Sequence, residues 1–312
     1  EKVNFFYNEN KIENFYTLKY HPEYPHLGSY IWAFFWKNSL VNYEYTGRLF
    51  CIYFYTISVF SLMNCMDDKL KKFRILFIIF IVVITFDPYL FSGYQDYFLF
   101  SILVVASRLL YFLDFNQINQ KLLMLIILSL GLLMWFKDEG LVYFLIFSIL
   151  LILNIKINLN LKLFYYVSIL LIIIFNFIIQ IYLLGIYEVQ AGTTSNSLKE
   201  INILLSNFDT IFIKSYKIVS HSIIASIKYL SWVLIFFSIF LISYEKKIDD
   251  KLKYLIQCLV FNLLFLYGAF MTFGAIDHML SLALDRLFFQ ISGFYLIIFL
   301  LLINKFHKKL SF

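Results

Sequence analysis

Residues 163–184 read LFYYVSILLIIIFNFIIQIYLL, a run without a single charged side chain. A helix of this length rises about 30 Å, which is roughly the thickness of the hydrocarbon core of a bilayer. Comparable apolar runs recur along the chain. They predict spans near 48–66, 75–91, 97–113, 122–136, 140–155, 163–184, 223–244, 254–273 and 287–304. The sequence therefore predicts an all-α fold, a polytopic helical membrane bundle of about nine transmembrane helices.

The composition of the whole chain supports a membrane protein. Of its 312 residues, 62% are hydrophobic and 21% are aromatic, and the mean hydropathy is +0.79. Only 15% are charged, against roughly 25% in a soluble domain. Cys51, Cys65 and Cys258 lie in or near apolar runs without CxxC spacing, which argues against a disulfide framework and against a zinc site. The nucleotide-binding motifs GxxxxGK[ST] and GxGxxG are missing from the sequence, so nothing in it indicates that the protein uses cytosolic ATP.

The distribution of lysine and arginine predicts the orientation of the spans. If 67–74 is cytoplasmic and the sides alternate, five inner segments hold 14 of the 26 basic residues, and three short outer turns hold two, Lys137 and Arg286. The inner segments are 67–74, 114–121, 156–162, 245–253 and 305–312, and the outer turns are 86–96, 137–139 and 274–286. This asymmetry accounts for the net charge of +6, so no nucleic-acid partner is needed to explain it.

The same pattern predicts one domain over residues 1–312. Its parts are the end of a first external loop with a short interfacial helix at 28–37 (1–47), the transmembrane helices with an external loop at 185–222 (48–304), and a cytoplasmic tail (305–312). The fourth and fifth spans are short and are expected to form a hairpin that does not fully cross the bilayer. The chain begins with Glu1 and lacks a signal-peptide pattern, so we expect an N-terminal piece, with at least one span, to precede it.

Carboxylates gather on the predicted outer face. Asp96 lies at the outer mouth of the third span, where a carboxylate can accept a proton from a hydroxyl, hold a divalent cation, or cap the helix. Glu139 is the second catalytic candidate. It follows Lys137, which is placed to bind a lipid phosphate; the alternative is an ordinary charged turn that ends at Gly140.

Basic and aromatic residues on the same face are candidates for substrate binding. Arg286 can bind a phosphate through two parallel hydrogen bonds, or it can pair with Asp285 and anchor the last helix. Further candidates are Arg48 and the polar group His21, Glu23 and Tyr24, which is flanked by prolines. His21 and Glu23 form a weak metal pair without a clear third ligand, so substrate contact or loop shape is favoured. The metal requirement stays unknown.

These clusters suit transfer from a lipid-phosphate donor. The leaving phosphate is already a stable anion, so one carboxylate to activate the acceptor hydroxyl and cations to neutralise the phosphate suffice. A lipid-linked glycan flippase or permease would need charges along a path through the bilayer, but the spans hold little beyond Arg108 and Lys228. An O-antigen-type polymerase or ligase usually has an arginine-rich external loop, and 185–222 has no arginine. A non-catalytic scaffold is a further alternative.

Several motifs resemble those of one enzyme superfamily. HPEYPHLGSYIWAFFW (21–36), followed by EYTGRLF (44–50), resembles the end of the first external loop of GT-C glycosyltransferases, the group of the protein O-mannosyltransferases and the lipid A aminoarabinose transferase, and is most similar to its bacterial branch. GYQDYFLFS (93–101) is similar to their acidic residue at the outer end of a later span. WFKDEGLVYF (135–144) resembles their Lys-x-x-Gly element, and LALDRLFFQISGFYLI (282–297) their Asp-Arg motif.

The resemblance implies a function and a location. It implies a polyprenyl-phosphate sugar donor, a lipid, glycan or protein acceptor, contact with membrane lipids, and inversion at the anomeric carbon. It implies an integral, multi-pass protein of the bacterial inner (plasma) membrane with its active face outward. The main catalytic Asp of the family precedes the His-Pro element, and no aspartate precedes His21 here. We therefore expect that residue upstream of Glu1.

Overall fold

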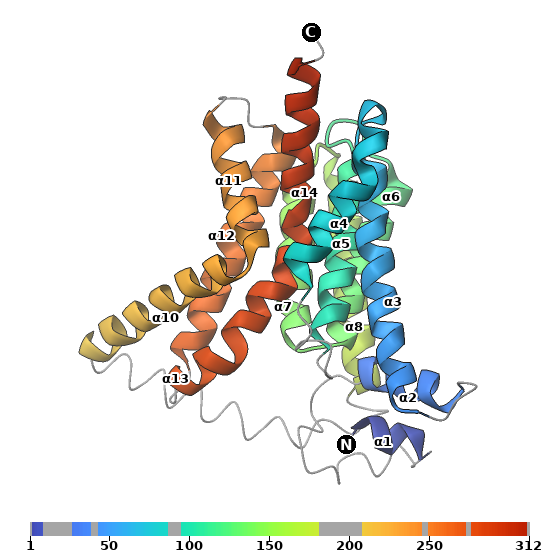
Figure 1. Cartoon of the computed structure of the whole chain (residues 1–312), viewed down its shortest axis with the longest axis vertical. Helices are drawn as coiled ribbons and strands as arrows, with labels where there is room; N and C mark the ends of the chain where they lie inside the picture. The colour runs from blue at the N-terminus through green and yellow to red at the C-terminus, as the bar shows by residue number, and fades with distance from the viewer. Residues whose placement is uncertain are drawn as a thin grey trace.

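The computed structural model describes residues 2–8, 27–38, 43–86, 95–180, 208–244, 249–272 and 276–310. Within these residues the fold is all-helical, without a strand. The long helices run up and down between two ends of the molecule (Figure 1). We call the end that holds the N-terminus and α13 the lower end, and the end that holds the C-terminus the upper end.

The helices follow the apolar runs of the sequence closely. Their bounds are α1 Lys2–Tyr7, α2 Leu27–Lys37, α3 Tyr45–Ser61, η2 Leu62–Cys65, η3 Asp68–Phe73, α4 Arg74–Thr85, α5 Asp96–Phe112, α6 Gln120–Gly131, η5 Leu132–Trp135, α7 Glu139–Asn154, α8 Leu159–Ile178, α10 Phe208–Lys228, α11 Leu230–Tyr244, α12 Asp250–Met271, α13 Ile276–Met279, the π-helix η7 Leu280–Leu284, and α14 Asp285–Leu310. The helix predicted at 28–37 is confirmed as α2.

Four helical stretches in the described residues are long and apolar enough to cross a membrane, and the number rises to five if one bent pair of helices is counted as a single span. The four are Tyr45–Cys65, Leu159–Ile178, Asp250–Met271 and Asp285–Phe306. Shorter apolar helices occupy Arg74–Thr85, Gln120–Trp135 and Glu139–Asn154. Each of the nine predicted spans coincides at least in part with a helix, and the apolar helices are compatible with a multi-pass membrane protein. Nine complete crossings stay a prediction.

The predicted span 223–244 is wrong in its extent. The chain bends by 96° between Asp209–Lys228 and Leu230–Ser243, so residues 223–228 belong to α10 and not to the vertical helix α11. Residues 208–222, which we placed in the external loop 185–222, are helical as well. No proline or glycine marks the bend, and the residues on either side of Lys228 and Tyr229 are mostly apolar. The sequence therefore predicted one span where the structure has two helices.

From α3 to α8, and again from α11 through α12 to α14, successive long helices alternate in direction, as the predicted topology requires (Figure 1). The described parts of the predicted inner segments meet at the upper end, where Lys156 N donates to Phe115 O and Lys251 Nζ donates to Tyr111 O at 2.6 Å. Asp96, Lys137 and Arg286 meet at the lower end. Which end faces the cytoplasm stays a prediction.

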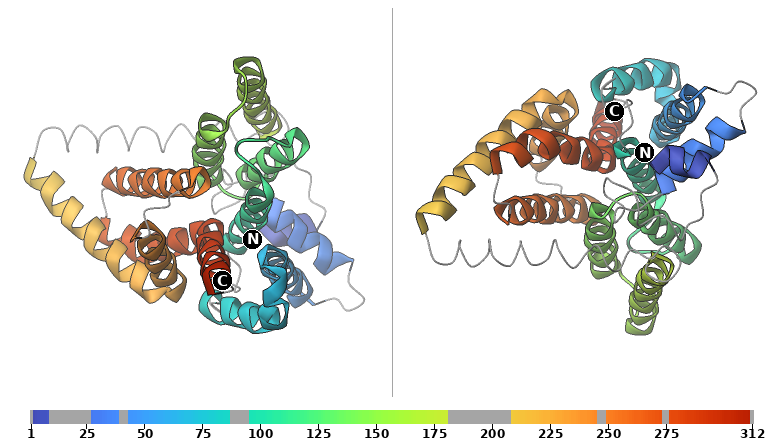
Figure 2. Two further views of the ribbon diagram at one scale, coloured as in Figure 1. Left: turned by 90° about the horizontal axis from the view of Figure 1, so that it is seen from above. Right: turned by 90° about the horizontal axis from the view of Figure 1, so that it is seen from below.

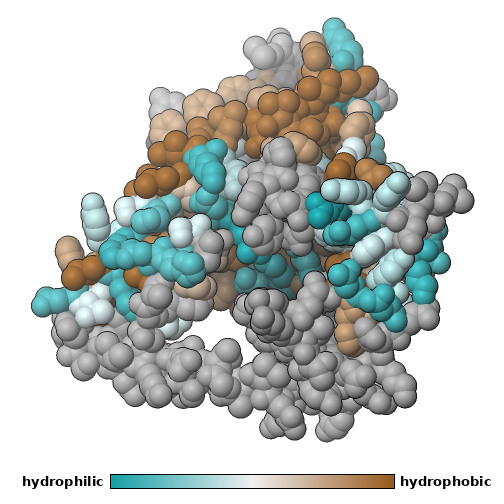
Figure 3. Space-filling model, turned by 60° about the horizontal axis from the view of Figure 1, so that its bottom comes forward, coloured by the Kyte–Doolittle hydropathy of each residue, from teal (hydrophilic) through white to brown (hydrophobic). Residues whose placement is uncertain are grey.

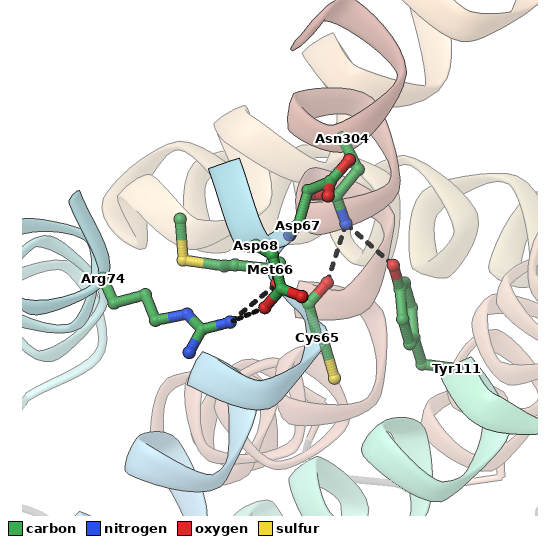
Figure 4. A network of polar contacts seen from close by, with 7 residues as sticks. All are labelled: Cys65, Met66, Asp67, Asp68, Arg74, Tyr111 and Asn304. Atoms are coloured by element: carbon green, nitrogen blue, oxygen red, sulfur yellow. Dashed lines mark hydrogen bonds and ion pairs between the residues drawn. The ribbon is translucent and has the colours of Figure 1, made fainter. Parts of the chain in front are cut away.

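A buried asparagine ties three parts of the chain together at the upper end (Figure 4). Asn304 of α14 donates from Nδ2 to Cys65 O at 2.7 Å and to Tyr111 Oη at 2.9 Å, and its Oδ1 accepts from Asp67 N at 3.1 Å. Side-chain amides that bond to backbone groups between helices fix those helices in register. The upper end of α14 is therefore attached both to the turn after α3 and to the end of α5.

Helix α14 lies at the centre of the bundle, where the views from above and below also place it (Figure 2), and 83% of its apolar window is buried. It packs closely on α5 because Gly293 has no side chain: a Cβ atom there would lie 2.5 Å from Phe100 O. The rings of Phe100 and Phe289 stack beside this point with centroids 4.7 Å apart. This close approach sets the separation between the lower ends of the two helices.

Candidate functional site

One carboxylate at the lower end is enclosed by donors from two other parts of the chain. Asp96, the first residue of α5, has no exposed surface. Lys137 Nζ lies 2.9 Å from its Oδ1, and Arg286 Nε lies 3.0 Å from its Oδ2. Gln290 Nε2 also donates to Oδ1. We call Asp96, Lys137, Arg286 and Gln290 the Asp96 cluster.

A tight turn between η5 and α7 places Lys137 in this cluster. The backbone N–H of Lys137 donates to Leu133 O, and that of Gly140 donates to Lys137 O. A Cβ atom on Gly140 would lie 2.1 Å from Leu133 O, so only glycine fits against this carbonyl without a shift of the backbone. The Lys-x-x-Gly spacing noted in the sequence thus has a steric basis.

Helix α14 supplies the other two donors of the cluster. Arg286 and Gln290 are four residues apart, so they share one face of the helix. The π-helix η7 ends at Leu284, directly before this helix begins at Asp285. Short π-helical turns are frequent at functional sites because they change the direction in which the following side chains point. The contact at Gly293 then holds this face of α14 against Asp96.

Two cationic groups, Lys137 and Arg286, share one carboxylate in the Asp96 cluster. The side chain of Asp96 is fully enclosed, whereas those of Lys137 and Arg286 are 14% and 24% exposed. Both cations therefore reach the molecular surface while their counter-ion does not. The geometry allows this group to bind an anion, with Asp96 holding the two cations in place.

The contacts of Asp96 differ from the roles that the sequence allowed. The N-cap position of α5 is Gln95, and the Asp96 carboxylate bonds to three side chains instead of to the free N–H groups of the helix. Because those donors occupy both oxygens, the carboxylate is better suited to position cations than to take a proton from a hydroxyl. The described residues also contain no group of three His, Cys, Asp or Glu side chains that could hold a metal ion.

Asp285 and Arg286 have different partners, although they are neighbours in sequence. Asp285 pairs with Lys228 at the end of α10, and Arg286 pairs with Asp96. The link between Lys228 and Asp285 attaches α10 to the start of α14. Glu139, the first residue of α7, is half-buried and makes no hydrogen bond or ion pair with another described residue.

Arg48 lies on α3 and binds locally. Its guanidinium is 3.3 Å from Glu44 and stands over the rings of Trp32 and Tyr45 at 5.2 and 5.1 Å. The Trp32 ring occupies the space above Gly47, where a Cβ atom would lie 2.1 Å from it. Arg48 therefore fastens α2 to α3 and is not part of the Asp96 cluster.

His21, Glu23 and Tyr24 lie outside the described residues, but the helix that follows them approaches the site. Gln95, directly before Asp96, donates from Nε2 to Ser29 Oγ of α2 at 3.3 Å. A Cβ atom on Gly28 would meet the same glutamine side chain at 2.7 Å. Helix α2 is thus in contact with Gln95, the residue that directly precedes α5.

Gln290 is the member of the cluster that sequence reasoning missed. It lies inside the apolar run predicted as the last span, and a single amide there matches no motif. The available signal was its spacing of four residues from Arg286, together with the cost of placing a polar side chain in a membrane helix without a partner.

Comparisons with protein-family models, with curated proteins and with solved structures found no match to this chain. The fold defines an all-helical protein with several helices of membrane-spanning length. A function for this protein is therefore inferred from the Asp96 cluster, the arrangement of the helices and the motifs of the sequence.

Proposed function

We propose that this protein is a membrane glycosyltransferase of the GT-C type. It moves a sugar from a polyprenyl-phosphate donor to a lipid, glycan or protein acceptor on the outer face of the bacterial inner membrane. Its helices cross the membrane about nine times, with the lower end outward.

One observation carries this proposal: three ionisable residues that the motifs singled out from distant parts of the chain meet in one cluster. Asp96, Lys137 and Arg286 are separated by 41 and up to 190 residues. They come together at the end of the bundle that the basic-residue asymmetry assigns to the outside. Two partly exposed cations on one carboxylate suit an anionic group such as a donor phosphate.

In the proposed reaction, Lys137 and Arg286 bind the donor phosphate and stabilise the charge that it gains as the glycosidic bond breaks. Asp96 is a positioning residue that keeps both cations at the surface. Glu139 lies two residues after Lys137 and forms no hydrogen bond or ion pair with another described side chain, so it is our candidate to accept the proton of the acceptor hydroxyl. Because phosphate is a good leaving group, a second carboxyl group to protonate it is not required.

A charged cluster at one end favours transfer over transport. A flippase that carries a lipid-linked glycan across the bilayer needs polar groups along its path. The ion pairs that the structure describes lie at the lower and upper ends, while the middle of α14 is packed with apolar residues such as Phe294 and Ile297.

The test is a graded series at Arg286 in protein reconstituted with a polyprenyl-phosphate sugar. Arg286→Lys keeps the charge but loses the planar fork, so transfer is expected to fall in part. Arg286→Ala removes both and is expected to lower transfer by about 30- to 1000-fold, equivalent to about 2–4 kcal/mol. Binding of polyprenyl phosphate itself should fall in the same order.

Arg74→Lys and Arg74→Ala are the matched controls, because Arg74 lies at the upper end and pairs with Asp68 at 3.5 Å. Both variants are expected to transfer and to bind like the wild type. Thermal unfolding of every variant separates loss of function from loss of fold. Equal transfer by the wild type, Arg286→Lys and Arg286→Ala would refute a role for Arg286 in donor binding.

A further inference from the structure

The hydroxyl group of Tyr143 is buried without a hydrogen-bond partner. The side chain has no exposed surface, and its Oη bonds to none of the described residues. Tyr55, Tyr254 and Tyr295 are also fully buried, but each of their hydroxyl groups has a partner within 2.9 Å. Because an unpaired buried hydroxyl lowers the stability of a fold, a buried tyrosine usually has a partner. The exception at Tyr143 therefore calls for a use other than folding.

The surroundings of Tyr143 fix its position. It lies in α7, whose first turn is held because Gly140 packs against Leu133 O. Its ring packs edge to face on Phe265 of α12, with the centroids 6.1 Å apart. Because the ring is fully enclosed, the hydroxyl stays in one place. A polar group that is held in this way needs no reorganisation at the moment of reaction.

The geometry of α7 places this hydroxyl near Glu139. Tyr143 follows Glu139 by four residues, so the two side chains share one face of the helix. Side chains of an α-helix lean toward its N-terminus, so the long side chain of Tyr143 extends toward the first turn, where Glu139 lies. The charges of Glu139 and Asp96 both act on the hydroxyl. Two carboxylates are therefore near the unpaired donor.

Glu139 is the better hydrogen-bond acceptor of these two carboxylates. The oxygens of Asp96 already accept from three donors. Glu139 is half-buried and makes no hydrogen bond or ion pair with another described residue. Hydrophilic side chains gather toward the lower end of the molecule (Figure 3), where α7 begins. Glu139 therefore reaches the surface at which a substrate arrives, whereas the Tyr143 hydroxyl is enclosed beneath it.

We propose that Tyr143 is a positioning residue for Glu139. When substrate occupies the site, the Glu139 carboxylate turns toward the Asp96 cluster and accepts a hydrogen bond from the Tyr143 hydroxyl. Catalytic hydrogen bonds are often long or poorly aligned before substrate binds, and they tighten in the complex. The bond holds Glu139 beside the acceptor hydroxyl, from which Glu139 takes the proton, while Tyr143 keeps its own. This role rests on the proposed sugar transfer.

The first measurement is thermal unfolding of the full chain without substrate. Tyr143→Phe removes the hydroxyl and keeps the ring, so its Tm is expected to equal that of the wild type or to lie slightly above it. Tyr254→Phe is the matched control, because the Tyr254 hydroxyl donates to Phe147 O at 2.9 Å. Its Tm is expected to fall by about 2–4 °C. An equal fall in Tyr143→Phe would show that the hydroxyl serves the fold and would overturn the proposal.

The second measurement is transfer from a polyprenyl-phosphate sugar by the reconstituted full chain. Tyr143→Phe is expected to lower kcat about 10-fold, as for the loss of a hydrogen bond to a charged group. The KM for the donor is expected to stay unchanged, because Lys137 and Arg286 still bind its phosphate. Tyr254→Phe is expected to transfer like the wild type. In a Glu139→Gln background, Tyr143→Phe is expected to cause no further loss, because it acts through that carboxylate.

The outcomes distinguish this role from the proposed function. A wild type that transfers no sugar would refute sugar transfer, and the role of Tyr143 with it. If the wild type transfers sugar and Tyr143→Phe has the same kcat, the role of Tyr143 alone is refuted and the proposed function stands. A tenfold loss that persists in the Glu139→Gln background would mean that the hydroxyl acts on another group, which would also overturn the proposal.

Discussion

Replacing Asp96 by Asn keeps the shape of the side chain and removes its charge. Breaking a buried ion pair in this way costs about 3–5 kcal/mol, because the remaining charge loses its partner. Here the two cations are 14% and 24% exposed, so water can compensate them in part. Gln290 Oε1 is buried and accepts no hydrogen bond from the described residues, so a flip of this amide lets it accept one from the new amide group, worth about 1 kcal/mol. The net loss is expected to be about 2–3 kcal/mol.

This loss can be measured by equilibrium unfolding in mixed micelles of increasing sodium dodecyl sulfate content, followed by tryptophan fluorescence. Asp277→Asn is the matched control. It makes the same chemical change in a pair whose carboxylate side chain is 67% exposed, and exposed pairs contribute about 0–1 kcal/mol. The difference between the losses of unfolding free energy in the two variants gives the effect of burial on the strength of the Asp96 ion pairs.

The reasoning is refuted if Asp96→Asn unfolds within about 0.5 kcal/mol of the wild type, the scatter of neutral surface changes. A double-mutant cycle gives a second criterion. Asp96→Asn and Arg286→Gln should couple by about 1 kcal/mol or more, because their side chains bond directly. Additive losses would mean that the cluster stabilises the fold only weakly.

Two further predictions concern the packing and the orientation of the bundle. Gly293→Ala is expected to lower the free energy of unfolding by about 1–3 kcal/mol, because the new methyl group would lie 2.5 Å from Phe100 O. Gly268→Ala, which meets nothing within 4 Å, should be neutral or slightly stabilising, and thermal unfolding compares the two. A cysteine at Asp277 should react with an impermeant maleimide added outside sealed cells, whereas one at Asp250 should be protected. Labelling at Asp250 would invert the topology.

The helices were predictable because each apolar run in a membrane protein must satisfy its own backbone hydrogen bonds. Hydropathy therefore located the ends of α8 and α12 to within about six residues. It failed between α10 and α11, where mostly apolar residues lie on either side of Lys228 and Tyr229. A sharp change of direction there depends on what each face of α10 contacts. In the sequence, these contacts are indicated by the polar residues Lys214 and Ser215, which lie on the inner face of α10.

The members of the candidate site were predictable one at a time, and their contacts were not. Asp96, Lys137 and Arg286 attract notice because each is an ionisable residue at the edge of an apolar run. Their pairing depends on the close approach of α5 and α14 at Gly293, which no local pattern encodes. For the same reason, the sequence suggested only a catalytic, cation-binding or capping role for Asp96, whereas its complete burial among three donors predicts a substantial loss of stability in Asp96→Asn.

The separation of 190 residues between Asp96 and Arg286 also sets an order of assembly. At about 5–20 residues per second, α14 leaves the ribosome about 10 to 40 s after the start of α5. During that interval Lys137 is the sole cation of the cluster that can compensate the Asp96 carboxylate, and the groove on α5 that receives Gly293 is unfilled. Insertion of the last helix therefore completes the charge cluster and the central packing in one step. A chain that stalls before that step presents a partly compensated carboxylate at the membrane surface, a feature by which membrane quality-control machinery can distinguish it from the finished protein.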